Sequence, residues 1–332
     1  MDATLKFGSK FVNWRKHSWI NPLLDGNSAI HFNNYLFQKF AFERLNRLWS
    51  SKFRVLEGDV KEVLNREDRV TVRVNDTEHD FDYVLDCMGF PTDFSNYLVS
   101  DCSPVNRCEI VNIPAGEFNY EPYTDHIAHE NGWMFGVPLQ SRKTYGYMYN
   151  DQITSREEAQ MDVMKILGVK EIDNKEYRFR CYYSNQLISG RVGKNGNKAL
   201  FFEPIIANSI FLYIYTARLF YDFITGATNR DDCNNAFMAS ANEVTDVVSY
   251  YYQGGSLFDS KFWQFAQPAA KKRLAGRQRF QDTMRIYANF KSRGILNHAP
   301  TYTFVPLNWE YIDSKLGYHY IEPEPKMATS SK

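Results

Sequence analysis

Two lysines near the start of the chain are the first residues whose setting could support chemistry. Lys6 and Lys10 lie in residues 5–14, where Phe11 and Trp14 contribute to the mixed alternating and aromatic pattern of a β-strand. Side chains four residues apart on one strand lie on the same face, so we expect both amines on one side of it. Because most lysines are simply solvated, a surface strand is the ordinary interpretation, and a positioned ammonium donor is the alternative.

A second candidate site follows an expected strand at residues 83–86. This strand ends in Asp86, and Gly89 follows three residues later. Glycine lacks the Cβ atom that would hold a ligand away from the backbone, so such a strand end can lie against a nucleotide or a flavin. The same pattern occurs in many α/β proteins that bind no ligand, and that interpretation stays open.

A strand-to-helix corner at residues 196–210 is the third candidate. Gly196 and Asn197 precede an expected strand, and Pro204 is expected in the first turn of a helix. The free N–H groups and partial positive charge of a helix N-terminus suit a pyrophosphate, a flavin carbonyl or a halide ion. A purely structural corner is the other interpretation.

An aromatic hairpin is the fourth candidate, since residues 132–139 and 145–149 have the pattern of two strands joined by a turn. We expect one sheet face to carry Trp133, Phe135, Tyr147 and Tyr149. Ligand sites are mostly apolar and aromatic, so this face could form one wall of a pocket for a flat substrate. A hairpin in a core sheet would show the same pattern.

The elements around these candidates indicate an α+β or α/β protein. Apolar residues at helical spacing predict an amphipathic helix at residues 33–49. Short runs rich in Val, Phe and Leu predict strands at residues 53–56, 60–64, 70–74 and 81–86. Later in the chain we expect a β-rich region, a helix and a mostly helical region at residues 108–149, 155–167 and 204–293, with loops beyond. We expect one domain over residues 1–320 and a mobile tail over residues 321–332.

Composition excludes several classes of function. The 332 residues include 44% apolar residues, enough for a globular core, and 39 Lys and Arg balance 39 Asp and Glu, so no nucleic-acid partner is expected. Five cysteines without CxxC pairs indicate neither a metal site nor a disulfide framework, and favour a cytoplasmic protein. The longest apolar run, residues 205–224, contains Arg218 and Asp222, which favours a buried or half-buried helix over a membrane span.

Taken together and in this order, these segments resemble the flavin-dependent halogenases of the tryptophan halogenase family. The matching segments run from residue 5 to about residue 265 and are Lys6 with Phe11-Val12-Asn13-Trp14, Asp86-Cys87-Met88-Gly89-Phe90, Tyr123-Thr124, Gly132-Trp133, Val137-Pro138-Leu139, Gly146-Tyr147-Met148-Tyr149, Phe201-Phe202-Glu203-Pro204-Ile205 and Phe258-Asp259-Ser260-Lys261-Phe262-Trp263. The ordered set is far more specific than any single segment.

The resemblance implies an FAD-dependent monooxygenase-like fold with a β-sheet substrate region and a helical C-terminal part. In that family FAD, reduced by a separate flavin reductase, reacts with oxygen, and a halide ion is oxidised to hypohalous acid. A lysine then holds the oxidant by a hydrogen bond or as a chloramine. The implied roles are Lys6 in catalysis, Asp86, Gly89, Gly196, Asn197 and Pro204 at FAD, Asn208 and Ser209 at the halide, and Trp133, Phe135 and Glu203 at a small aromatic substrate.

Two departures from the family pattern change what is expected. The family carries a GxGxxG turn upstream of the lysine, whereas this sequence starts five residues before Lys6. We therefore expect an incomplete fold that binds FAD weakly alone, and a separate N-terminal FAD-binding fragment is one partner that this implies. Ile206 and Ala207 stand where tryptophan-specific members have glutamate and serine, which favours an aromatic substrate other than free tryptophan.

Three functions stay open at this point. The first is an oxidoreductase that halogenates an aromatic or indole-type molecule, in truncated or split form. The second is a non-catalytic remnant or binding module that keeps the aromatic pocket without the cofactor. The third is a flavin-dependent aromatic monooxygenase that hydroxylates its substrate, because the scaffold is shared.

Overall fold

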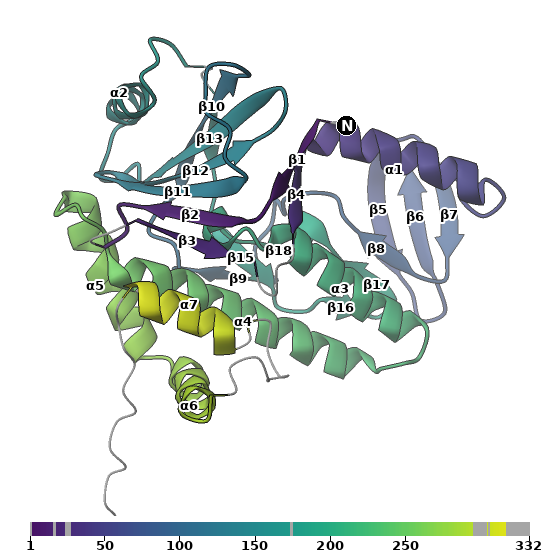
Figure 1. The fold of residues 1–332 in the computed structure, drawn as a ribbon. Helices are drawn as coiled ribbons and strands as arrows, with labels where there is room; N and C mark the ends of the chain where they lie inside the picture. The colour runs from purple at the N-terminus through teal and green to yellow at the C-terminus, as the bar shows by residue number, and fades with distance from the viewer. Residues whose placement is uncertain are drawn as a thin grey trace, which may run out of the picture.

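A mixed, mostly antiparallel sheet forms the centre of the molecule (Figure 1). The computed structural model describes residues 2–15, 18–23, 28–172, 175–294, 304 and 306–316. In spatial order the strands of this main sheet are β14 (Lys175–Arg178), β10 (Arg107–Pro114), β13 (Arg142–Tyr149), β12 (Gly132–Pro138), β11 (Tyr123–His129), β2 (Gly8–Val12) and β3 (Trp19–Pro22). Only the β2–β11 pairing is parallel among these strand pairs of the described residues.

Helices cover both faces of the main sheet. The larger core lies against α4 (Arg230–Gly254) and α5 (Lys261–Ala275), and it includes Trp133 and Met148. On the opposite face Met134, Tyr147 and Tyr149 pack against α2 (Arg156–Leu167). Further helices of the described residues are α3 (Ser209–Ile224), α6 (Gln278–Ser292), α7 (Pro306–Leu316) and the 3-10 turns η2 (Gly196–Lys198) and η3 (Pro204–Ile206). No described helix is both long and apolar enough to cross a lipid bilayer.

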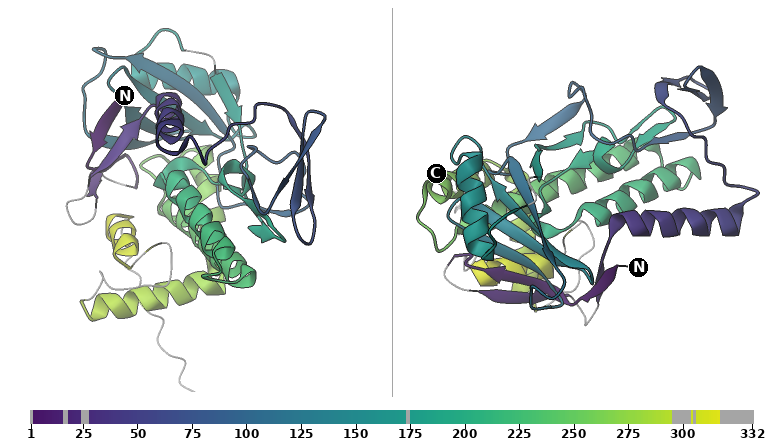
Figure 2. Two further views of the ribbon diagram at one scale, coloured as in Figure 1. Left: turned by 90° about the vertical axis from the view of Figure 1, so that its right-hand side faces the viewer. Right: turned by 90° about the horizontal axis from the view of Figure 1, so that it is seen from above.

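A short two-stranded ribbon, β1 (Ala3–Lys6) with β4 (Ala29–Phe32), connects the main sheet to a second lobe. Of three small sheets, the first lies in this lobe with helix α1 (Asn34–Trp49), and the other two contribute residues to the larger core. Their strands are β5 (Val60–Asn65), β6 (Val70–Val74) and β7 (Thr77–Phe81); β16 (Ile188–Ser189), β17 (Val192–Lys194) and β8 (Val84–Asp86); and β18 (Leu200–Phe201), β15 (Cys181–Ser184) and β9 (Tyr97–Ser100). Figure 2 shows α1 standing apart from the other helices.

Most of the expected elements are present in the structure. The helix expected at residues 155–167 forms as α2, which Ser155 caps in a reciprocal capping box with Glu158. The β-rich region, the aromatic hairpin and the helical region after residue 204 are confirmed. The expected helix at residues 33–49 forms as α1, but none of its residues is buried and Phe37, Phe40 and Trp49 are exposed. Its ring contacts, Phe37 with Phe32 and Phe42 with Phe53, therefore leave most of its apolar surface exposed.

Four expectations about elements were wrong. Residues 53–56 form no regular element, because this segment pairs with no strand, and residues 81–86 divide between β7 and β8. Pro204 begins a 3-10 turn, since the α-helix starts only at Ser209. A helix, α7, forms where loops were expected, because its buried Trp309 and Ile312 pack into the larger core. The expected tail, residues 321–332, lies outside the described residues.

Candidate functional site

Lys6 is the last residue of β1, and it does not share a strand with Lys10. The Phe7 N–H donates to Pro122 O at 2.8 Å, outside either ladder, and the chain then enters β2. Lys10 lies on β2 and donates to Glu121 Oε2 at 2.6 Å. The expectation of one continuous strand with both amines on one face is therefore wrong.

The Lys6 ammonium is half-buried and has no hydrogen bond or ion pair with another described residue. Burial lowers the pKa of Lys6 to about 8, and no carboxylate counteracts it. The nearby titratable groups are neutral imidazoles. Burial and the Lys6 charge hold the pKa of His126 at about 3, and burial, Lys6 and Lys143 hold that of His31 at about 4. At neutral pH the site therefore presents a mostly protonated donor without an anionic partner.

A stack of rings extends from the Lys6 side of the sheet into the larger core. Phe11 lies parallel to His126 with ring centroids 4.6 Å apart, and His126 lies parallel to Trp133 at 5.7 Å. Trp133 has no exposed surface, whereas Phe135 is only half-buried. Of these two predicted substrate residues, Phe135 keeps surface that a ligand can contact, and the Trp133 ring lies beside it with centroids 6.2 Å apart.

The prediction of four aromatic side chains on one sheet face was wrong. Cross-strand partners share a face, and Trp133 pairs with Met148 while Met134 pairs with Tyr147. Tyr147 and Tyr149 therefore lie on the opposite face from Trp133, in the smaller core under α2. Gly132 pairs with Tyr149, and it is this register between the two strands that places Tyr147 and Tyr149 on the face opposite Trp133.

Glu203 is a fully buried carboxyl group at the strand-to-helix corner. It accepts hydrogen bonds from Tyr252 Oη, at 2.8 and 3.1 Å, and from Ser103 Oγ. Burial raises the pKa of Glu203 to about 7, although these donors and the nearby Trp133 indole pull it down, and no cation contributes. Glu203 therefore belongs to the same buried cluster as Trp133 but has no surface open to a ligand.

The candidate flavin residues lie where two parallel strands end side by side. Strands β8 and β17 pair in parallel, with Asp86 opposite Lys194, and Gly89 and Gly196 follow these ends. Both glycines have a left-handed backbone, with φ of +78° and +59°, and a Cβ atom built on either would meet nothing within 4 Å. Ligands of α/β proteins bind outside such carboxyl ends. Open space at both glycines fits a flat ring or a phosphate approaching the backbone.

Asn197 and the corner that follows it are tied together through α3. Tyr213 Oη donates to Asn197 Oδ1 at 2.6 Å, so the side chain of Asn197 is already engaged. At the start of α3, Asn208 occupies the N-cap position without capping the helix, and both of its side-chain polar atoms are buried without a partner. Ser209 is the first helical residue. An unpartnered amide N–H at a helix N-terminus suits a small anion.

The structure brings predicted residues together in two places. Asp86, Gly89, Gly196 and Asn197 lie at the parallel strand ends. Trp133 and Glu203 lie in one buried cluster, where Trp133 stacks on His126, whose pKa the Lys6 charge helps to lower. The described residues contain no cluster of three or more His, Cys, Asp or Glu side chains suited to a metal ion.

Sequence reasoning missed three residues of this region, namely His31, His126 and Tyr252. The alternation in residues 29–32 would have placed His31 on one strand face, and His126 follows Thr124 by two residues, which is the spacing of one strand face. Neither pattern indicates what the imidazole contacts. Tyr252 lies in the long helix α4, and its hydrogen bond to Glu203 depends on tertiary packing alone.

Comparison with known proteins gives a family match over most of the chain. The family model described as tryptophan halogenase matches residues 20–319. Tryptophan 7-halogenase RebH of Lentzea aerocolonigenes is 23% identical over 305 residues, which are 83% of this chain and 54% of that protein. Tryptophan 7-halogenase KtzQ of Kutzneria is 25% identical over 206 residues, 55% of this chain and 37% of that protein. The chain thus spans about half or less of the length of these curated relatives.

Solved structures share the same fold. A tryptophan halogenase from Shewanella frigidimarina superposes with a TM-score of 0.78 at 15% identity, covering 99% of this chain and 76% of the other. BrvH, a flavin-dependent halogenase from Brevundimonas, superposes with a TM-score of 0.77 at 17% identity, covering 95% and 77%. At these identities the likeness establishes the fold. It agrees with the fold class that the sequence predicted.

Proposed function

The chain belongs to the tryptophan halogenase family, and from that premise we propose that it carries out the lysine-dependent step of flavin-dependent halogenation on a small aromatic molecule of indole type. Reduced FAD, oxygen and a halide ion supply hypohalous acid when the cofactor is bound. The Lys6 ammonium donates a hydrogen bond to the oxygen of this acid, which makes the halogen more electrophilic. A carbon of the aromatic ring then bonds to the halogen as the halogen–oxygen bond breaks, and the ring proton leaves with the hydroxide as water.

The observation that carries this proposal is the state of Lys6. A half-buried ammonium with no acceptor is costly, and proteins seldom keep one without a use for it. Its pKa of about 8 leaves most of the amine protonated at pH 7, as a donor must be. Lys10, four residues later, already donates to Glu121, so its ammonium is not free to donate to a ligand.

The proposed cofactor and halide positions follow from the second group of residues. Asp86, Gly89, Gly196 and Asn197, with Pro204 at the corner, would hold the flavin ring and its neighbouring phosphates. Asn208 Nδ2 and the Ser209 end of α3 would receive the halide. Their support is the open space at the two glycines and the unpartnered amide of Asn208.

We further propose two protein partners and a cytoplasmic location. A flavin reductase would supply reduced FAD by diffusion. A separate N-terminal FAD-binding fragment would cover α1, whose apolar side chains, including Phe37, Phe40 and Trp49, are exposed with none of its residues buried. Exposed apolar side chains gathered on one helix favour such a partner.

The test is a bromination assay with FAD, a flavin reductase with its nicotinamide donor, bromide and indole, followed by mass spectrometry of the product. Brominated indole is expected from the wild-type chain. Lys6→Met should lower the rate roughly 10²- to 10³-fold, as loss of one preorganised donor does in other enzymes. Lys10→Met is the matched control, because it removes a lysine of the same segment outside the proposed site, and it should retain activity.

Two results would contradict the proposal. A hydroxylated product that persists in the Lys6→Met variant would identify an aromatic monooxygenase. Dialysed protein that neither perturbs the flavin absorption spectrum nor yields brominated indole, with or without an added FAD-binding fragment, would identify a non-catalytic binding module.

A further inference from the structure

The ribbon formed by β1 and β4 presents two different faces. In its antiparallel register Lys6 lies opposite Ala29, and Thr4 lies opposite His31. Cross-strand partners and residues two apart share a face, so these four side chains point the same way. On the other face, Leu5 and its cross-strand partner Ile30 are both exposed. Lys6 therefore lies on the inward face, opposite the small side chain of Ala29.

His31 ties this inward face to the main sheet through two hydroxyl groups. Its Nε2 lies 2.9 Å from Thr124 Oγ1 on β11, and its Nδ1 lies 3.5 Å from Thr4 Oγ1. Thr4 already donates its hydroxyl hydrogen to Pro138 O at 2.6 Å, so it can only accept from His31. The His31 Nδ1 therefore carries the hydrogen, and Nε2 accepts from Thr124.

The charges around His31 keep this arrangement neutral. Lys6 faces it from β1, and Lys143 faces it from the main sheet, where Lys143 is paired with Asp125 at 2.6 Å. His126 lies on the Lys6 side as well and is neutral. With burial, these cations disfavour protonation of His31 throughout the range near neutral pH. The imidazole thus adds no second positive charge beside the Lys6 ammonium.

We propose that His31 is a positioning residue for Lys6: its hydrogen bond to Thr124 docks the ribbon on the main sheet and thereby holds the Lys6 ammonium in the half-buried site. A two-stranded ribbon has little stability of its own, so its place depends on such attachments. The effect of His31 on halogenation rests on the function proposed for Lys6, whereas its effect on the position of Lys6 does not.

The first test measures Lys6 itself in the protein without added cofactor. Lysine labelled with ¹³C at Cε is followed by NMR across pH, and the Lys6 signal is assigned by its loss in Lys6→Arg. In His31→Leu the ribbon loses its hydrogen bond to Thr124 and keeps that of Thr4 to Pro138 O. The loosened ribbon leaves the ammonium more hydrated, so the Lys6 pKa should rise by at least about one unit from about 8. His31→Gln, whose amide can reach the position of Nε2, should keep the wild-type value. A Lys6 pKa that stays near 8 in His31→Leu would overturn the proposal, because a merely structural histidine would leave it unmoved.

A double-mutant cycle with Thr124→Val identifies the bond responsible. Thr124→Val removes the same hydrogen bond from the other side, so it should shift the Lys6 pKa as His31→Leu does, and the double variant should add little. Additive shifts would overturn the role of this bond.

Halogenation kinetics form the final readout. His31→Leu should lower kcat at least about tenfold with little change in the KM for indole, and His31→Gln should restore most of it. Wild-type protein that shows the NMR response but makes no brominated product would refute the proposed function while leaving the positioning of Lys6 by His31 intact. Protein that brominates indole but whose Lys6 pKa does not change in His31→Leu would refute the positioning role of His31 and leave the proposed function intact.

Discussion

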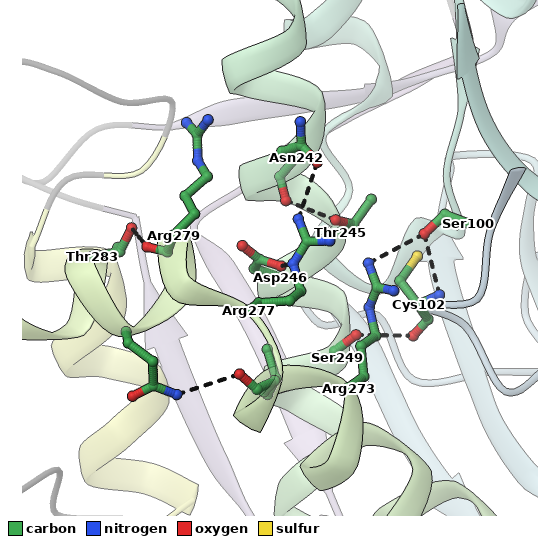
Figure 3. A network of polar contacts seen from close by, with 12 residues as sticks. Ser100, Cys102, Asn242, Thr245, Asp246, Ser249, Arg273, Arg277, Arg279 and Thr283 are labelled. Atoms are coloured by element: carbon green, nitrogen blue, oxygen red, sulfur yellow. Dashed lines mark hydrogen bonds and ion pairs between the residues drawn. The ribbon is translucent and has the colours of Figure 1, made fainter. Parts of the chain in front are cut away.

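Two buried regions of this protein hold charged groups in opposite ways. Among the described residues, the half-buried Lys6 ammonium has no carboxylate partner, and the buried Glu203 carboxyl group has no cation. Between helices α4 and α6, by contrast, Asp246 forms an ion pair with Arg277, and Arg277 also donates to Asn242 Oδ1 at 3.0 Å (Figure 3). In the helical region each charge thus has an oppositely charged partner, which we call the compensated network. Lys6 and Glu203 have no such partner among the described residues.

Paired and unpaired buried charges affect stability differently, which helps to distinguish a structural role from a functional one. A buried ion pair holds helices in register but contributes little net stability, because desolvation offsets the attraction. An unpaired buried charge lowers stability outright and so needs another reason to be present. Removing one partner should therefore destabilise the helical network, whereas neutralising Lys6 or Glu203 should stabilise the fold.

The largest expected effect on stability comes from breaking the compensated network. Asp246→Leu leaves the Arg277 guanidinium, about a quarter of which is exposed, without its carboxylate. The free energy of unfolding should fall by about 3 kcal/mol, the lower end for a buried pair. Denaturant unfolding followed by circular dichroism measures this change. The double variant with Arg277→Met should recover most of the loss, since it removes the charge left behind. A double variant as unstable as Asp246→Leu alone would show that packing, not charge, dominates this region.

Neutralising Glu203 should raise the free energy of unfolding, by an amount that depends on pH. Its folded pKa of about 7 lies above the ordinary 4.5, so the folded protein loses stability as pH rises through this interval. Glu203→Gln cannot ionise, so it should match the wild type near pH 4.5 and exceed its unfolding free energy by up to roughly 3 kcal/mol above pH 7. Thermal unfolding from pH 5 to pH 9 checks the trend. A gain that does not change with pH would exclude ionisation as its cause.

Neutralising Lys6 should also stabilise the fold, with the pH dependence reversed. The folded pKa of about 8 lies below the ordinary 10.5, so wild-type stability rises with pH between these values. Lys6→Met should be more stable by about 2 kcal/mol at pH 7, because the buried charge is gone, and the gain should vanish above pH 10.5. A variant that loses bromination while gaining stability would show that Lys6 is kept for function at a cost in stability.

Local chemistry decided which parts of the fold could be predicted from the sequence. The start of α2 follows from Ser155 and Glu158, whose side chains cap the helix without help from distant residues. The hairpin was also predicted from local pattern, although its second strand begins at Arg142 and not at Tyr145. The face on which Tyr147 lies was not, because it depends on the register between β12 and β13. The break of the first strand at Phe7 likewise requires Pro122, more than a hundred residues away.

The candidate site shows the same limit. Lys6 could be singled out because a lysine in an aromatic strand is unusual, and the order of several segments supported it. Its burial could not be foreseen, because it arises from the packing of two short strands against a sheet formed much later in the chain. His31 and Tyr252 contact their partners only across such distances, so no spacing in the sequence indicates them.

The smallest expected effect comes from Lys10, which has a partner but lies near the surface. Its ion pair with Glu121 leaves about a third of its side chain exposed, and pairs of this kind contribute less than about 1 kcal/mol. Lys10→Met should therefore change the free energy of unfolding by less than about 1 kcal/mol. Added salt should make the difference between Lys10→Met and the wild type smaller still, because it screens the ion pair. Urea unfolding in 0.05 M and 1 M salt measures both. Since Lys6 and Lys10 are only four residues apart, a Lys10 variant that gained stability as Lys6→Met does would remove the distinction between an unpaired and a paired ammonium on which the site assignment depends.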